Sequence, residues 1–138
     1  MASLVYNSMI EDLCNGELAF DNSGFKVALV GSGYNASKSH ARFSDVTNEV
    51  SGTGYGAGGQ GTTITISKDN VNNRVDLAFS NVAWSNATVT AKGAVIYFGQ
   101  GADPTAMPLV AFVDFNQEIS STNASFAVTF SAPLRFQN

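Results

Sequence analysis

Residues 62–79 read TTITISKDNVNNRVDLAF, the clearest β-hairpin pattern in the chain. Polar and apolar residues alternate in 62–67 (TTITIS) and again in 74–79 (RVDLAF), as expected for strands with one buried face. The intervening residues 69–73 (DNVNN) are rich in Asn and Asp, which favour turns. We therefore predict two antiparallel strands joined by a turn.

Further strand patterns flank this hairpin at short spacing. They are residues 25–30 (FKVALV), 87–98 (ATVTAKGAVIYF), 109–115 (LVAFVDF), 125–130 (SFAVTF) and 134–136 (LRF). Gly93 is expected to mark a β-bulge, a polar loop is expected to separate the strands at 109–115 and 125–130, and the last strand is expected at a sheet edge. This pattern predicts a mainly β fold, an antiparallel β-sandwich or jelly roll with one short N-terminal helix.

That helix is predicted over residues 7–16 (NSMIEDLCNG). Asn7 or Ser8 can cap its start, and Gly16 suits its end. Apolar residues recur with the i, i+3, i+4 spacing that predicts a buried helix face. The members of this face are Met9, Ile10, Leu13 and Cys14. We accordingly expect Cys14 to be a buried small hydrophobic residue and not a nucleophile.

Length and composition predict a single domain spanning residues 1–138. The chain is 44% hydrophobic but only 13% charged, so its polar surface must come largely from Ser, Thr, Asn and Gln. The net charge is −4 and the seven basic residues are scattered singly, which argues against binding nucleic acid. No apolar run reaches the roughly 18 residues of a membrane span, and no signal-peptide pattern opens the chain. One cysteine permits no internal disulfide.

Two glycine motifs resemble phosphate-binding loops. The strand at 25–30 leads into Gly31-x-Gly33-x-x-Ala36, the outline of a dinucleotide-binding fingerprint. That fingerprint requires a helix immediately afterwards, and residues 37–54 lack helical periodicity. The second motif, Gly56-x-Gly58-x-x-Gly61, leads into a strand. We therefore predict that both are loops, that the glycine run at 52–61 links strands, and that no cofactor is bound.

No catalytic or metal site is predicted. His40 is the sole histidine and lies in a polar segment without a nucleophile elbow, so we expect a solvated loop residue and no enzymatic activity. The acidic residues at Asp69, Asp103, Asp114 and Glu118 are too dispersed for a calcium loop.

Most aromatic residues fall on the predicted strands and are expected in the core. Trp84, in the segment NVAWSNAT, could instead be half exposed as a platform on which a sugar ring stacks, but core packing is the better interpretation.

Several longer phrases, in a fixed order, cover nearly the whole chain. They are LVYNSMIEDLCNGELAFDNSGFKVALV (4–30), FSDVTNEVSGTGYGAGG (43–59), NRVDLAFSNVAWSNATVTAKGAVIYF (73–98), LVAFVDF (109–115) and SFAVTFSAPLRF (125–136). Together they resemble a family of small virion structural proteins of tailed bacteriophages and prophages, and DVTNEVSGTGY (45–55) is the most specific part. Some small β proteins of this kind are capsid decoration, or cement, proteins.

The resemblance implies a non-enzymatic protein that binds the outside of the capsid. Its partners would be the major capsid protein and its own copies, as a dimer or trimer. It would be located on the virion surface after assembly in the cytoplasm of the bacterial host. No catalytic residue or cofactor comes with the family. Two other roles stay open: a head- or tail-fibre adhesin that binds host glycans, with Trp84 as the seed of its site, and a tail-tube or tail-completion subunit.

Two segments are predicted to attach the protein to a neighbour. The first is the apolar N-terminal stretch, and the second is the glycine loop, which has few side chains to anchor it. We expect both to become ordered only against a sister copy or the capsid. Gly→Ala changes at Gly54 and Gly58 should then weaken attachment and leave the monomer intact. The predicted contact residues are Leu4, Val5, Tyr6, Gly52, Gly54, Tyr55, Gly56 and Gly58.

Overall fold

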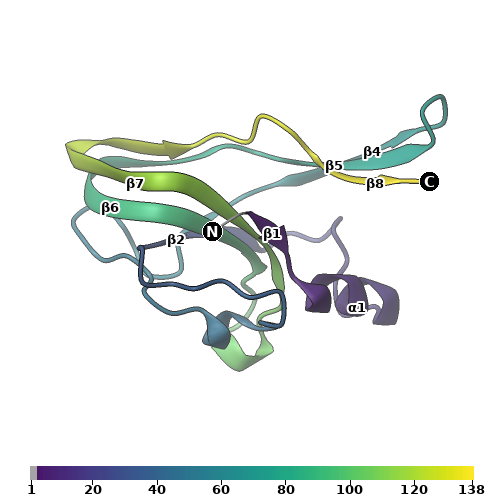
Figure 1. Cartoon of the computed structure of the whole chain (residues 1–138), viewed down its shortest axis with the longest axis horizontal. Coiled ribbons are helices and arrows are strands. Elements are labelled where there is room, and N and C mark those ends of the chain that lie inside the picture. Colours follow the sequence, from purple (N-terminus) through teal and green to yellow (C-terminus); the bar gives the residue numbers. More distant parts are fainter. Residues whose placement is uncertain (1–2) are drawn as a thin grey trace.

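The computed structural model describes residues 3–138, which form two antiparallel β-sheets and one α-helix (Figure 1). The five-stranded sheet has the order β1-β7-β6-β2-β3, and the three-stranded sheet has the order β4-β5-β8. The elements are β1 (Leu4–Val5), α1 (Asn7–Asn15), β2 (Phe25–Val30), β3 (Gln60–Gly61), β4 (Ile64–Asp69), β5 (Arg74–Phe79), β6 (Val82–Phe98), β7 (Leu109–Val128) and β8 (Leu134–Gln137). Short 3₁₀ turns occur at Phe43–Asp45 and Pro104–Ala106.

The predicted hairpin is confirmed as β4 and β5. Their register runs from Ile64 opposite Phe79 to Asp69 opposite Arg74. In the turn, the Asp69 carboxylate accepts hydrogen bonds from the backbone N–H groups of Val71 and Asn72. The predicted edge strand is also confirmed, because β8 pairs with β5 at the edge of the smaller sheet.

The β6–β7 ribbon is the longest feature of the fold. It pairs from Tyr97 opposite Leu109 to Val82 opposite Val128. The register shifts between Ala91 and Gly93, which confirms the bulge predicted at Gly93. Both strands bend sharply, and the two halves of the ribbon lie over one another (Figure 1).

The prediction of separate strands at 109–115 and 125–130 is wrong, because β7 continues through residues 116–124. These residues resemble a loop because nearly all are polar, and all but Ser121 are exposed in the structure. They pair with the first half of β6, whose outward face is also solvated. Asn116 and Asn123 have positive φ angles of 65° and 47°, so Asn absorbs the local distortions and the strand is not interrupted.

The helix is confirmed at Asn7–Asn15, but its predicted buried face is confirmed only at Met9 and is wrong for Ile10, Leu13 and Cys14. The buried residues are Ser8, Met9 and Asp12, whereas Cys14 is exposed. The Asp12 carboxylate is buried and accepts two hydrogen bonds from the Arg42 guanidinium, at 2.7 and 3.3 Å. A buried carboxylate requires such a partner, and this pair determines which side of the helix faces the core. The helix N-cap is Tyr6, and no side chain caps it.

Apolar residues are buried on both faces of the five-stranded sheet. On β2, Val27 and Leu29 belong to one cluster, which includes Trp84 and Val110. Ala28 and Val30 belong to a second cluster on the opposite face, with Tyr6, Tyr34, Tyr97, Met107 and Phe112 among its members. Burial on both faces explains why residues 27–30 of β2 (VALV) form a continuous apolar run and do not alternate.

The bend can be tested with Gly93→Ala. A Cβ atom at position 93 would lie 2.6 Å from the Phe112 ring and 2.8 Å from the carbonyl oxygen of Val113. The backbone oxygen cannot move away without disturbing the ribbon, so we expect a loss of about 1–3 kcal/mol in the free energy of unfolding. The measurement is chemical denaturation. Gly61→Ala is the control, because its Cβ would meet only the Phe25 oxygen at 3.8 Å. Equal stability of the two variants would contradict this account.

Candidate functional site

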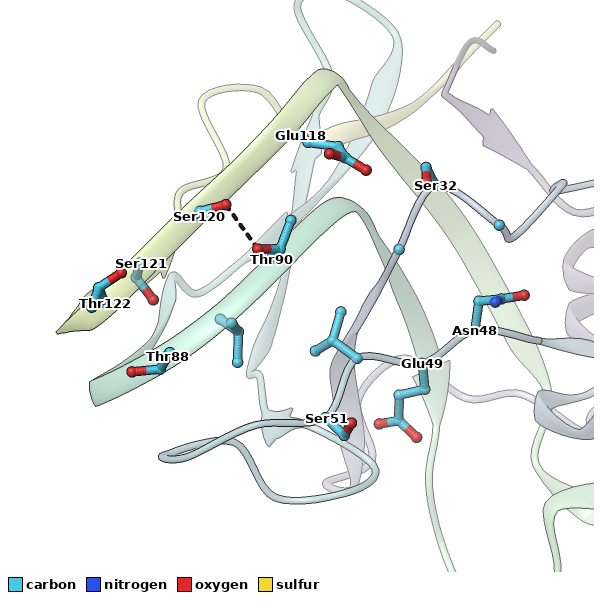
Figure 2. Close-up of a pocket in the computed structure, with 14 residues that line it drawn as sticks. Ser32, Asn48, Glu49, Ser51, Thr88, Thr90, Glu118, Ser120, Ser121 and Thr122 are labelled. Atoms are coloured by element: carbon cyan, nitrogen blue, oxygen red, sulfur yellow. Dashed lines mark hydrogen bonds between the residues drawn. The ribbon is translucent and has the colours of Figure 1, made fainter.

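A surface groove lies between the first half of β6, the adjacent part of β7 and two loop segments (Figure 2). Its volume is about 630 Å³. Hydroxyl groups predominate in the lining, from Ser32, Ser51, Thr88, Thr90, Ser120, Ser121 and Thr122, and Asn48, Glu49 and Glu118 complete the polar set. The groove is therefore a hydrogen-bonding surface with two carboxylates.

Pairing between β6 and β7 fixes the hydroxyl groups of one wall. The hydroxyl oxygens of Thr90 and Ser120 lie 2.8 Å apart across the two strands. The Ser121 hydroxyl donates to the carbonyl oxygen of Ala87 at 2.7 Å, and the Thr88 hydroxyl accepts from the backbone N–H of Asn123 at 2.9 Å. Backbone register and these bonds hold the wall in one arrangement.

The opposite wall comes from residues 48–51, which run beside the end of β2. The Gly31 N–H donates to the Asn48 carbonyl at 2.9 Å, and the Val50 N–H donates to the Leu29 carbonyl at 3.0 Å. Gly31 and Gly33 of the dinucleotide-like motif thus line a groove, and no α-helix follows them. The prediction that this motif is a loop is confirmed.

The glycine run is a place of close backbone approach. The run leaves the edge of β2 and contacts β6, where the Thr88 N–H donates to the Thr53 carbonyl at 2.9 Å. It then returns to β2 and pairs with it as β3. A Cβ atom at Gly52 would lie 2.2 Å from the Thr88 oxygen, and one at Gly59 would lie 1.8 Å from the Val27 oxygen. Only glycine permits these approaches.

Tyr55 anchors the glycine run. Its side chain is buried, and its hydroxyl accepts from the Leu29 N–H at 3.0 Å and donates to the Glu49 carboxylate at 2.6 Å. The same carboxylate oxygen accepts from the Gly58 N–H at 2.6 Å, while the Tyr97 hydroxyl donates to the Gly58 carbonyl at 2.6 Å. The Glu49 carboxylate and the hydroxyl groups of Tyr55 and Tyr97 therefore fix the loop at Tyr55 and at Gly58.

The protonation of these phenols follows from their surroundings. Burial, together with the hydrogen bond to the Glu49 carboxylate, raises the pKa of Tyr55 above its usual value. Burial and the nearby charge of Glu49 raise the pKa of Tyr97 to about 12. Both hydroxyls therefore carry their protons at neutral pH, as their donor roles require.

The expectation that the two attachment segments lack anchors within the chain is wrong. Gly52, Gly54, Tyr55, Gly56 and Gly58 belong to the loop that Tyr55 fastens. Their role as contacts to a neighbour stays a prediction.

The N-terminal segment is likewise anchored within its own chain. Leu4 and Val5 pair with Phe112 and Ala111 of β7. Tyr6 is fully buried. The two segments lie against different strands, one on β7 and the other on β6 and β2. Contacts of Leu4 and Val5 with a neighbour stay a prediction.

His40 is not a freely solvated residue. Its Nδ1 atom lies 2.9 Å from the Tyr34 hydroxyl, which lies 2.9 Å from the Tyr6 hydroxyl. Burial raises the pKa of both phenols. These hydrogen-bonded side chains link Tyr6, the N-cap of α1, to the loop after β2.

The Trp84 side chain is only 2% exposed, which confirms core packing and rules out a stacking platform at this position. Its ring packs against Tyr55 and Phe126.

The groove has the chemistry of a binding surface. None of its 14 lining residues is a His, Cys, Lys or Arg. Within residues 3–138, no three His, Cys, Asp or Glu side chains gather where they could hold a metal ion. In the same range, no helix has the length and apolar character to span a bilayer.

Comparison with known proteins adds no relative: no protein-family model, curated protein or solved structure matches this chain.

Gly54→Ala and Gly56→Ala test the structure of the glycine run. Gly54 has a φ of +83°, and its Cβ would lie 2.7 Å from the Asn86 oxygen, whereas a Cβ at Gly56 would have open space. We expect Gly54→Ala to lower the unfolding free energy by about 2–4 kcal/mol and Gly56→Ala to change it by less than about 0.5 kcal/mol. Thermal unfolding measures both. If Gly54→Ala were as stable as the wild type, this account of the loop would be wrong, and the prediction from the sequence that the change leaves the monomer intact would stand.

Tyr55→Phe tests the anchor. The change leaves the buried Leu29 N–H without its acceptor and removes one donor from Glu49. We expect a loss of about 1–3 kcal/mol in urea denaturation. Glu49→Gln, which keeps the side-chain size and one acceptor oxygen, should lose less. An unchanged denaturation midpoint in Tyr55→Phe would show that the hydroxyl does not hold the loop.

Proposed function

We propose that this chain is a non-enzymatic structural protein of a tailed-phage virion, which binds and stabilises the outside of the capsid as a decoration protein. The proposal rests on the sequence resemblance and on one structural observation: a surface groove is lined largely by hydroxyl groups and has no His, Lys or Arg in its lining. The proposed partners are the major capsid protein and further copies of this chain, as a dimer or trimer.

A surface of this kind suits contact with another protein. Exposed side chains on the first half of β6 and on residues 116–125 of β7 are almost all Ser, Thr, Asn, Gln or Ala. Such groups exchange water for protein partners at a small desolvation cost, because they carry no charge. A decoration protein present in many copies can bind through several weak contacts of this type.

The proposal includes the fold class. The bent β6–β7 ribbon and the β4-β5-β8 sheet supply the layers from which an antiparallel β-sandwich or jelly roll would be built. A β body of this kind provides the rigid support that a cement protein requires.

The adhesin alternative loses the residue on which it depended. Its glycan site was to be seeded by an exposed Trp84, and this side chain is buried. The groove lining contains no aromatic residue on which a sugar ring could stack. The following experiment also tests the other alternative, a tail-tube or tail-completion subunit, because it would show the protein bound along the tail.

The test is binding to phage heads. Purified protein is mixed with complete, tailed phage particles that lack it, the particles are pelleted, and the pellets are imaged by cryo-electron microscopy. We expect saturable co-sedimentation at a fixed number of copies per head, with the added density on the outer surface. Density along the tail would replace the proposal with a tail role, and the absence of binding to any virion part would refute a structural role.

A further inference from the structure

The outward side of α1 is apolar although the helix is packed against the body of the protein. Ile10 is 53% exposed and Leu13 is 37% exposed, and Cys14 is exposed as well. Residues at i, i+3 and i+4 of a helix share one side, so these three side chains form one surface, called here the helix face. Figure 1 places α1 at an outer corner of the molecule.

The Asp12–Arg42 pair explains this orientation. Asp12 is 1% exposed and lies on the inward side of the helix, where it bonds to a guanidinium from a segment 30 residues later. Turning the apolar residues inward would expel this pair from its site. The helix therefore keeps Asp12 inside and presents Ile10, Leu13 and Cys14 to the surroundings.

Acidic residues flank the helix face in the sequence. Glu11 lies next to Ile10 in the helix, and Glu17 and Asp21 follow its end; all three are exposed. Residues 3–25 contain no Lys or Arg, and the one guanidinium that reaches the helix, from Arg42, is already bound to Asp12. Residues 3–25 thus combine an exposed apolar centre with exposed carboxylates and no cation of their own.

We propose that the helix face docks on an apolar patch bordered by Lys or Arg side chains on the protein that this chain decorates. The inference rests on the proposed function, for which it names the attaching element and the chemistry of the partner. A second copy is the weaker candidate, because two-fold packing of α1 on itself would bring Glu11 and Glu17 towards their own copies. Lys or Arg side chains on a partner would instead attract the carboxylates of Glu11 and Glu17.

The first experiment compares two variants in the head-binding assay. Ile10→Ser/Leu13→Ser removes the apolar centre, and Val71→Ser is the matched control, because Val71 is 89% exposed at the remote β4–β5 turn. Both variants should unfold within a few degrees of wild type. We expect the first to bind heads at least about tenfold more weakly and the control to bind normally. Glu17→Lys should also weaken binding, and added salt should weaken binding of the wild-type protein.

The second experiment uses Cys14, the one cysteine of the chain, as a probe of coverage. A maleimide should label it rapidly in the free protein and much more slowly in protein bound to heads. Normal head binding by Ile10→Ser/Leu13→Ser, with Cys14 still reactive on the head, would overturn this inference and leave the proposed function standing. Protection of Cys14 in a dimer without heads would assign the face to a second copy and also overturn it. Failure of the wild-type protein to bind any head would overturn both.

Discussion

The β6–β7 ribbon has to bend within its own length, and the rest of the fold depends on that bend. The half that contains Gly93 to Phe98 pairs with β2 in the centre of the larger sheet, while the half that contains Trp84 and Val89 contributes to the same core cluster. One two-stranded ribbon thus supplies both sides of a core. Gly93, with no room for a Cβ, and Asn116, with its positive φ, are the residues that allow this.

Local signals predicted the elements that depend on neighbours in sequence. Alternation and a turn of Asp and Asn were sufficient for the β4–β5 hairpin, and the bulge at Gly93 was also foreseen. The continuity of β7 was not predicted, because residues 116–124 are nearly all polar and resemble a loop in composition, although they form a solvent-exposed part of the strand. The rotation of α1 could not be predicted either: apolar spacing favoured Leu13, whereas Asp12 has its partner 30 residues away at Arg42.

The candidate groove could not be predicted from the sequence, because it depends on contacts between distant segments. Its walls come from separate segments, near residues 31–33, 48–51, 88–90 and 118–122, and Ser and Thr are too frequent in this chain to indicate a site. Glu49 gave a faint signal, as a lone carboxylate just before a glycine run. Its function as the acceptor for Tyr55 and Gly58 depends on a loop path that no local pattern specifies.

The position of β1 affects the order in which parts of the chain can fold. β1 pairs with Phe112 and Ala111, and the Ser3 hydroxyl accepts from the Asp114 N–H across 111 residues of sequence. During synthesis, the segment before α1 therefore leaves the ribosome long before its partner strand exists. Closing so long a loop is slow compared with forming a hairpin. The apolar N-terminal strand must wait, unpaired, until the β6–β7 ribbon has formed, and its docking is then among the last steps of folding.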